Sequence, residues 1–140
     1  MHYYQPGKSN FYELMFLNTQ ILKLSQLSLI LILLTVLFFA FMPGPVTPAF
    51  VVNHDKAFHF LVFFALSLLL TFAMPKIRHR FHVVSLFLFA IAIELIQLLF
   101  VHRGYSLMDI LYDVSGITSF YLLIFLYRMN FHAKSHKQNQ

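Results

Sequence analysis

The sequence predicts an all-α polytopic membrane protein with four transmembrane helices, on the evidence of its composition and its apolar segments. Apolar residues make up 59% of the 140 residues and charged residues only 11%, whereas soluble domains hold about 45–50% and about 25%. Four segments approach the roughly 20 apolar residues that a helix needs to cross a bilayer. They are Leu27 to Met42, Ala57 to Met74, Phe81 to Val101 and Leu107 to Tyr127. A water-soluble globule, a disordered chain and a fibrous repeat are therefore excluded.

Helix-breaking residues separate the four segments. Pro43, Gly44, Pro45 and Pro48 follow the first segment. Pro75 ends the second, and Gly104 lies in the turn before the fourth, where Ser106 can cap the helix. A cleavable signal peptide is the alternative for the first segment, but no small-x-small cleavage site follows it, so we expect an uncleaved helix.

The flanking regions complete a three-part organisation. Residues 1–26 are expected to form a cytoplasmic tail containing an amphipathic segment in the membrane interface, with a disordered tail as the alternative. Residues 27–127 form the four-helix membrane domain, and residues 128–140 form a basic cytoplasmic tail. There is no Cys, which excludes disulfides, thiol catalysis and Cys-ligated zinc.

The net charge of +5 is explained by membrane topology rather than by nucleic acid. With four spans, both termini and the loop around Pro75 share one side. That side carries Lys8, Lys23, Lys76, Arg78, Arg80, Arg128, Lys134 and Lys137, against Lys56 and Arg103 on the other. The positive-inside rule predicts that both termini are cytoplasmic. We expect membrane lipid as a partner and no nucleic acid, and oligomeric state stays open.

Polar residues of three segments converge towards the outer side. Ionisable residues are costly inside a membrane and usually face a bundle interior, where they are functional candidates. Helical spacing places Asp55 with His59, Glu94 with Gln97, and Asp109 with Asp113 and Gly116, each set on one face. Lys56 and Arg103 lie nearby. Gly116 lets another helix approach closely, so we expect the fourth helix to pack centrally.

Each of these residues also has a purely structural interpretation. Asp109 follows Ser106 at capping-box spacing. Lys56, Asp55 and Arg103 could be solvated contacts with lipid headgroups. His59 could be a hydrogen-bonded structural imidazole, and Glu94 could bond Gln97, Arg103 or a neighbouring helix.

The same residues resemble the VanZ-like family of small bacterial membrane proteins. The stretches that carry the resemblance are HDKAFHFLVFF, IELIQ and HRGYSLMDILYDVSG, between Asp55 and Gly116. The family pattern is matched at Asp55, Lys56, His59, Glu94, Gln97, Arg103, Asp109 and Gly116. The departure is Asp113, where the family more often has Asn. The resemblance implies a four-helix protein of the bacterial cytoplasmic (inner) membrane and a link to teicoplanin resistance, but no reaction.

Three functional hypotheses follow. In the first, the cluster binds a polar or anionic group of a lipid-linked envelope molecule, with Lys56 and Arg103 on phosphate or carboxylate. The acids Asp55, Glu94 and Asp109 would orient these two cations and hydrogen-bond sugar or peptide groups of the ligand. Gln97 and Asp113 complete the set of ligand-binding candidates. No cofactor is expected.

The second hypothesis is an intramembrane hydrolase or transferase acting on a lipid headgroup. His59 would be general base or nucleophile, Asp55 its orienting partner and Glu94 a general acid. In one variant, Asp109, Asp113, Glu94 and His59 hold Mg or Mn, although no tight metal-ligand spacing is present. The third hypothesis is structural: the cluster holds the helices together, and function lies with a partner protein. Ion transport ranks lowest, because there is no inverted repeat.

Overall fold

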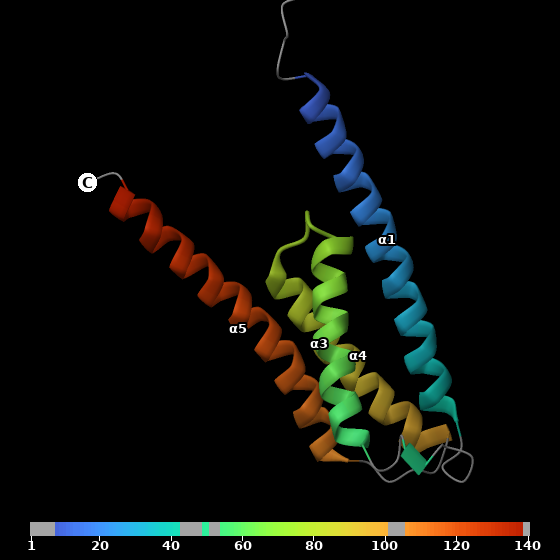
Figure 1. Ribbon diagram of the computed structural model, residues 1–140. Coiled ribbons are helices and arrows are strands. Elements are labelled where there is room, and N and C mark those ends of the chain that lie inside the picture. Colours follow the sequence, from blue (N-terminus) through green and yellow to red (C-terminus); the bar gives the residue numbers. More distant parts are fainter. Residues whose placement is uncertain (1–7, 43–48, 51–53, 101–105, 139–140) are drawn as a thin grey trace, which may run out of the picture.

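The computed structural model describes the backbone of residues 8–42, 49–50, 54–100 and 106–138, and the side chains of residues 18–42, 49–50, 54–99 and 106–129. Four long helices account for nearly all of this chain. They are α1 (Lys8–Phe41), α3 (Asp55–Ala73), α4 (His79–Phe100) and α5 (Leu107–Gln138). Successive helices run in opposite directions, so α1 begins and α5 ends at the same end of the bundle (Figure 1). The prediction of an all-α chain is confirmed.

Two helix boundaries follow from local chemistry that the sequence predicted. Helix α3 stops at Ala73, where the N–H of Met74 donates to the carbonyl of Leu70 and Pro75 cannot continue the ladder. Helix α5 begins after Ser106, whose hydroxyl accepts a hydrogen bond from the N–H of Asp109 at 3.2 Å. The predicted breaks at residues 43–48 and at Gly104 lie outside the described residues.

Helix α1 is longer than the predicted first span. It runs without interruption from Lys8 to Phe41, and within its described side chains Asn18–Phe41 is a candidate membrane span, which includes residues upstream of the predicted start at Leu27. The predicted interfacial segment and the predicted span therefore belong to one helix. The position of its first turns relative to a membrane interface stays a prediction. Helix α5 likewise continues through most of the predicted basic tail.

All four helices are long and apolar enough to cross a membrane. Their membrane-compatible parts are Asn18–Phe41, Asp55–Ala73, His79–Leu99 and Leu107–Met129. Large apolar side chains such as Leu34, Leu61 and Leu88 are exposed on the outer faces of the bundle, as expected where lipid replaces water. The protein is therefore a multi-pass membrane protein.

The helix at the centre of the bundle is α3, and the expectation that the fourth helix packs centrally is wrong. Helix α3 packs against α1, α4 and α5, whereas α5 contacts only α3 and α4 among the described helices. Helices α1 and α5 diverge on opposite sides of α3 (Figure 1). The core includes Phe63 and Leu66 of α3, which meet residues of the other three helices: Leu29, Leu86, Ala90 and Ile117. The second apolar segment contacts every other helix, as α4 also does, but it lies between α1 and α5 and forms with α5 the most extensive helix contact.

The contact between α3 and α5 depends on Gly116. A Cβ atom at this position would overlap the backbone carbonyl oxygen of Phe60 and would lie 3.0 Å from the backbone nitrogen of Phe64. The two backbones are therefore as close as a glycine permits, which is a common device in membrane helix pairs. The predicted role of Gly116 in a close helix contact is confirmed.

We expect Gly116→Ala to destabilise the protein by about 1–3 kcal/mol, the usual cost of inserting a methyl group into a fully packed contact. The neighbouring atoms are backbone, so the helices themselves must separate. Detergent-solubilised protein titrated with SDS would measure the change. Ser115→Ala is the matched control, because the Ser115 hydroxyl bonds only the Tyr112 carbonyl of its own helix. Equal stability of Gly116→Ala and the parent chain would contradict the close approach.

Candidate functional site

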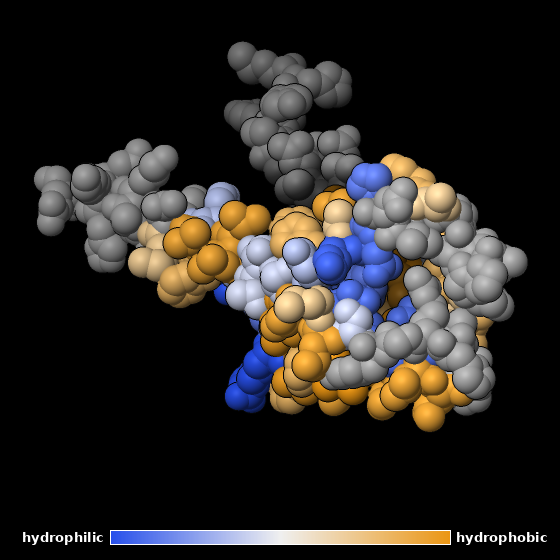
Figure 2. Space-filling view, turned by 90° about the horizontal axis from the view of Figure 1, so that it is seen from below, coloured by the Kyte–Doolittle hydropathy of each residue, from blue (hydrophilic) through white to orange (hydrophobic). Residues whose placement is uncertain are grey.

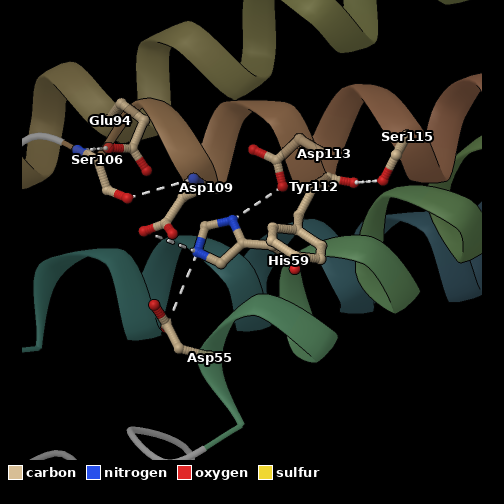
Figure 3. A network of polar contacts seen from close by, with 8 residues as sticks. All are labelled: Asp55, His59, Glu94, Ser106, Asp109, Tyr112, Asp113 and Ser115. Atoms are coloured by element: carbon tan, nitrogen blue, oxygen red, sulfur yellow. Dashed lines mark hydrogen bonds and ion pairs between the residues drawn. The ribbon is translucent and has the colours of Figure 1, made fainter.

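Five polar residues meet at one end of the bundle, where α3 and α5 begin and α4 ends. They are Asp55 and His59 of α3, Glu94 of α4, and Asp109 and Asp113 of α5, named here the His59 cluster (Figure 3). Seen from this end, hydrophilic residues lie in the middle of the molecule and hydrophobic residues surround them (Figure 2). The sequence predicted that these residues converge, and the structure brings all five together.

His59 lies between three carboxylates. Its Nδ1 is 2.8 Å from Oδ1 of Asp113, which accepts a hydrogen bond from the ring. Its Nε2 is 3.7 Å from Oδ2 of Asp109 and 3.9 Å from Oδ1 of Asp55. The partner that orients the ring is therefore Asp113 on α5, whereas the sequence analysis assigned that role to Asp55. In the neutral imidazole, donation from Nδ1 to Asp113 places the lone pair of Nε2 towards Asp55 and Asp109.

At the start of α5, Glu94 accepts the hydrogen bond that a capping box would assign to Asp109. The backbone N–H of Ser106 donates to Oε2 of Glu94 at 3.1 Å, so a carboxylate from α4 satisfies the capping residue of α5. In a capping box, this acceptor would come from the third residue of the same helix, here Asp109. Because Glu94 supplies it, the Asp109 side chain is available to face His59.

The cluster holds buried oxygens that lack hydrogen-bond partners. Glu94 and Asp113 are each only 1% exposed. Among the described residues, nothing bonds Oε1 of Glu94 or Oδ2 of Asp113. No described Lys or Arg forms an ion pair with any of the four acids, whose salt-bridge contacts are all to His59. Buried carboxylate oxygens without hydrogen-bond partners are costly, so additional hydrogen-bond donors or a cation would stabilise the cluster.

The remaining predicted residues lie away from this centre or outside the described chain. Lys56 is exposed on α3 and forms no ion pair with any of the described acids. Gln97 is half-buried on α4 and lines a cavity beside His59. Arg103 lies outside the described residues. The structure therefore supports the acidic part of the predicted site more strongly than its basic part.

A cavity of about 460 Å³ lies between α1, α3 and α4, and two residues of the His59 cluster, Asp55 and His59, contribute to its polar side. Its lining residues are Thr35, Val36, Phe39 and Ala40 of α1, Asp55, Phe58, His59, Val62 and Phe63 of α3, and Ile93 and Gln97 of α4. Most of this surface is apolar. The volume falls within the range of about 300–1,000 Å³ that is typical of small-molecule sites.

The contribution of α1 to this cavity was not predicted. The part of α1 that lines the cavity is apolar apart from Thr35. In a sequence, apolar side chains that face lipid cannot be distinguished from apolar side chains that line a pocket. The one available signal is Thr35, whose hydroxyl bonds the Leu31 carbonyl. The bond between Glu94 and Ser106 was also missed, because it joins two helices.

The geometry also contains a possible metal-ligand set. Asp55, His59 and Asp109 each offer one ligand atom, and these atoms lie within 4.8 Å of one another. This set differs from the predicted one, since Asp55 replaces Glu94 and Asp113. The latter two carboxylates lie behind it, on Ser106 and on the far side of the His59 ring.

Fold and site together define a helical membrane protein with a buried histidine–carboxylate cluster beside an apolar cavity. Neither a family model, nor a curated protein, nor a solved structure matches the chain. The resemblance to the VanZ-like family therefore stays a prediction, based on the residues between Asp55 and Gly116.

We expect Glu94→Ala to destabilise the protein by about 1–3 kcal/mol, because the Ser106 N–H loses its acceptor in a partly buried site. Glu94→Gln keeps an amide oxygen at the same place and should retain most of the stability. SDS titration of the two purified variants would compare them. If Glu94→Gln were as unstable as Glu94→Ala, the charge of Glu94 rather than its cap would support the fold.

Proposed function

We propose that this protein binds a lipid-linked molecule of the bacterial envelope, holding its polar headgroup at the His59 cluster and part of its chain in the adjoining cavity. The observation that carries the proposal is that the His59 cluster and the cavity are continuous with each other. Asp55 and His59 belong to both, while the rest of the cavity surface is mostly apolar. A ligand that matches this surface is itself amphipathic.

The polar side of the cavity favours a headgroup rich in hydrogen-bond donors. Of the four acids, Asp55 lines the cavity, whereas Asp109, Glu94 and Asp113 lie beyond it in the cluster, and their oxygens are all acceptors when ionised. Sugar hydroxyls and the amines or amides of a peptide supply matching donors. Lys56, at the exposed edge of α3, is available for an anionic group such as phosphate, and Arg103 is the second cation proposed for that role.

The proposal places the cluster at the outer leaflet of the bacterial cytoplasmic membrane. Its support is the distribution of Lys and Arg. Lys76, Arg78 and Arg80 lie where α3 ends and α4 begins, away from the cluster, and Arg128 contacts His79 at the same end. Both termini are then cytoplasmic. An outward-facing site that engages envelope precursors would be consistent with a link to glycopeptide resistance, and in particular to teicoplanin, as the VanZ-like resemblance implies.

A second candidate is an intramembrane hydrolase or transferase that acts on such a headgroup. The observation that favours it is the short bond between Asp113 and Nδ1 of His59, which orients Nε2 towards the polar side of the cavity. An imidazole oriented in this way is the usual arrangement of a general base. Conversion of an added lipid to a product of new mass would support this candidate over simple binding.

We expect a larger side chain inside the cavity to weaken ligand binding. Val36→Phe introduces a ring from α1 and should weaken binding of a polyprenyl-diphosphate sugar at least tenfold, since the chain and the ring compete for the same volume. Native mass spectrometry of purified protein with added lipid measures the bound fraction. Phosphatidylglycerol and phosphatidylethanolamine, added separately, show whether ordinary lipids bind equally well.

Leu34→Phe is the matched control, because the same helix exposes this side chain on its outer face. It should bind the lipid like the parent chain. Equal binding by Val36→Phe and Leu34→Phe would overturn the proposed use of the cavity, and equal binding of all three lipids would remove the assignment to an envelope precursor.

In cells, we expect His59→Ala and Asp109→Asn to abolish any protection against teicoplanin while the protein remains at normal abundance in the membrane. Both side chains face the site and lie outside the core cluster around Phe63 and Leu66. Immunoblots of membrane fractions and susceptibility assays measure the two effects. Glu94→Ala, which also removes a helix cap, should lower abundance as well. Loss of protein in all three variants would instead favour a structural role for the cluster.

A further inference from the structure

We propose that Asp55, His59 and Asp109 bind one divalent transition-metal ion, and that Asp113 positions His59 for this role. The proposal does not depend on lipid binding. The three ligand atoms come from α3 and α5, the pair of helices that Gly116 brings into close contact. They belong to residues of types that bind such ions, namely one imidazole and two carboxylates.

The first argument is the spacing of the ligand atoms. Nε2 of His59 is 3.7 Å from Oδ2 of Asp109 and 3.9 Å from Oδ1 of Asp55. These separations are too long for hydrogen bonds. With bonds of about 2.1 Å, two ligands of a tetrahedral ion lie about 3.4 Å apart, so small movements of the side chains suffice to close the site.

The second argument is the environment of His59. Metal-ligating histidines usually donate their other ring N–H to a carboxylate, which fixes the tautomer and makes the ligating nitrogen more basic. Asp113 occupies that position: it is 1% exposed and bonds Nδ1 at 2.8 Å. A histidine that served only as a hydrogen-bonded core residue would not need three carboxylates around it.

The third argument is charge and unmet bonding. Three carboxylates surround one imidazole, Glu94 belongs to the same cluster, and no described Lys or Arg is paired with any of the four acids. Oε1 of Glu94 is buried without a partner in the described chain, and in Figure 3 this second oxygen is turned towards Asp109. An ion between Asp55, His59 and Asp109 would offset this charge, and water bound to the ion could donate to Glu94. The imidazole favours Zn²⁺ over Mg²⁺ or Ca²⁺, and the two carboxylates make Mn²⁺ the second candidate.

The test uses the full-length protein in detergent, stripped with a chelator and titrated with Zn²⁺ or Mn²⁺. We expect one ion per chain, and at least tenfold weaker binding in Asp55→Asn and Asp109→Asn, as measured by calorimetry and by elemental analysis after desalting. Co²⁺ should give visible absorption in the parent chain. Asp113→Asn should weaken binding less than the ligand variants and should shift the Co²⁺ spectrum, a change that a merely structural residue would not cause.

Gln97→Ala is the matched control, since Gln97 lines the cavity on α4 but is not a proposed ligand. It should bind metal normally, as should Val36→Phe, so that failure of lipid binding and failure of metal binding are distinguishable. Melting curves establish that each variant is folded. Absence of stoichiometric metal in the folded parent chain would overturn the proposal, as would undiminished binding in both ligand variants. An unchanged Co²⁺ spectrum in Asp113→Asn would remove the positioning role.

Discussion

The close contact of α3 and α5 at Gly116 is the constraint on which the rest of the site depends. One turn before Gly116, Asp113 bonds His59 of α3. One further turn towards the start of α5, Asp109 faces the same ring. A larger residue at position 116 would separate the two backbones, and a hydrogen bond of 2.8 Å does not survive a displacement of an ångström or more. The glycine therefore sets the geometry of the cluster without belonging to it.

Helix α4 contributes in a different way. Glu94 accepts the N–H of Ser106, so the carboxylate of one helix completes the start of the next. This bond ties the end of α4 to the beginning of α5 and leaves Asp109 free to face His59. A cap that joins two helices thus has a consequence for the site: it decides which of two carboxylates is structural and which is available for a ligand.

The cavity adds the third component, and it lies where α1 packs against α3 and α4; within the described parts of the chain, α1 does not contact α5. Helix α1 closes one side of the space beside His59 with apolar side chains, while α3 contributes the polar side. A bundle in which all four helices met around one axis would fill this space with core residues. The central position of α3 therefore explains how a small membrane protein holds both a buried polar cluster and room for a ligand.

The sequence by itself determined the four helices, the end of α3, the start of α5 and the convergence of the acids near His59. Those features depend on local rules: hydropathy over about 20 residues, proline chemistry, and helical spacing of three and four. Only the tertiary structure decided which carboxylate orients His59, which one caps α5, and which helix lies at the centre. Those outcomes depend on the rotation and separation of packed helices. An error of one residue in helix rotation, about 100°, exchanges a side chain that faces the site for one that faces lipid.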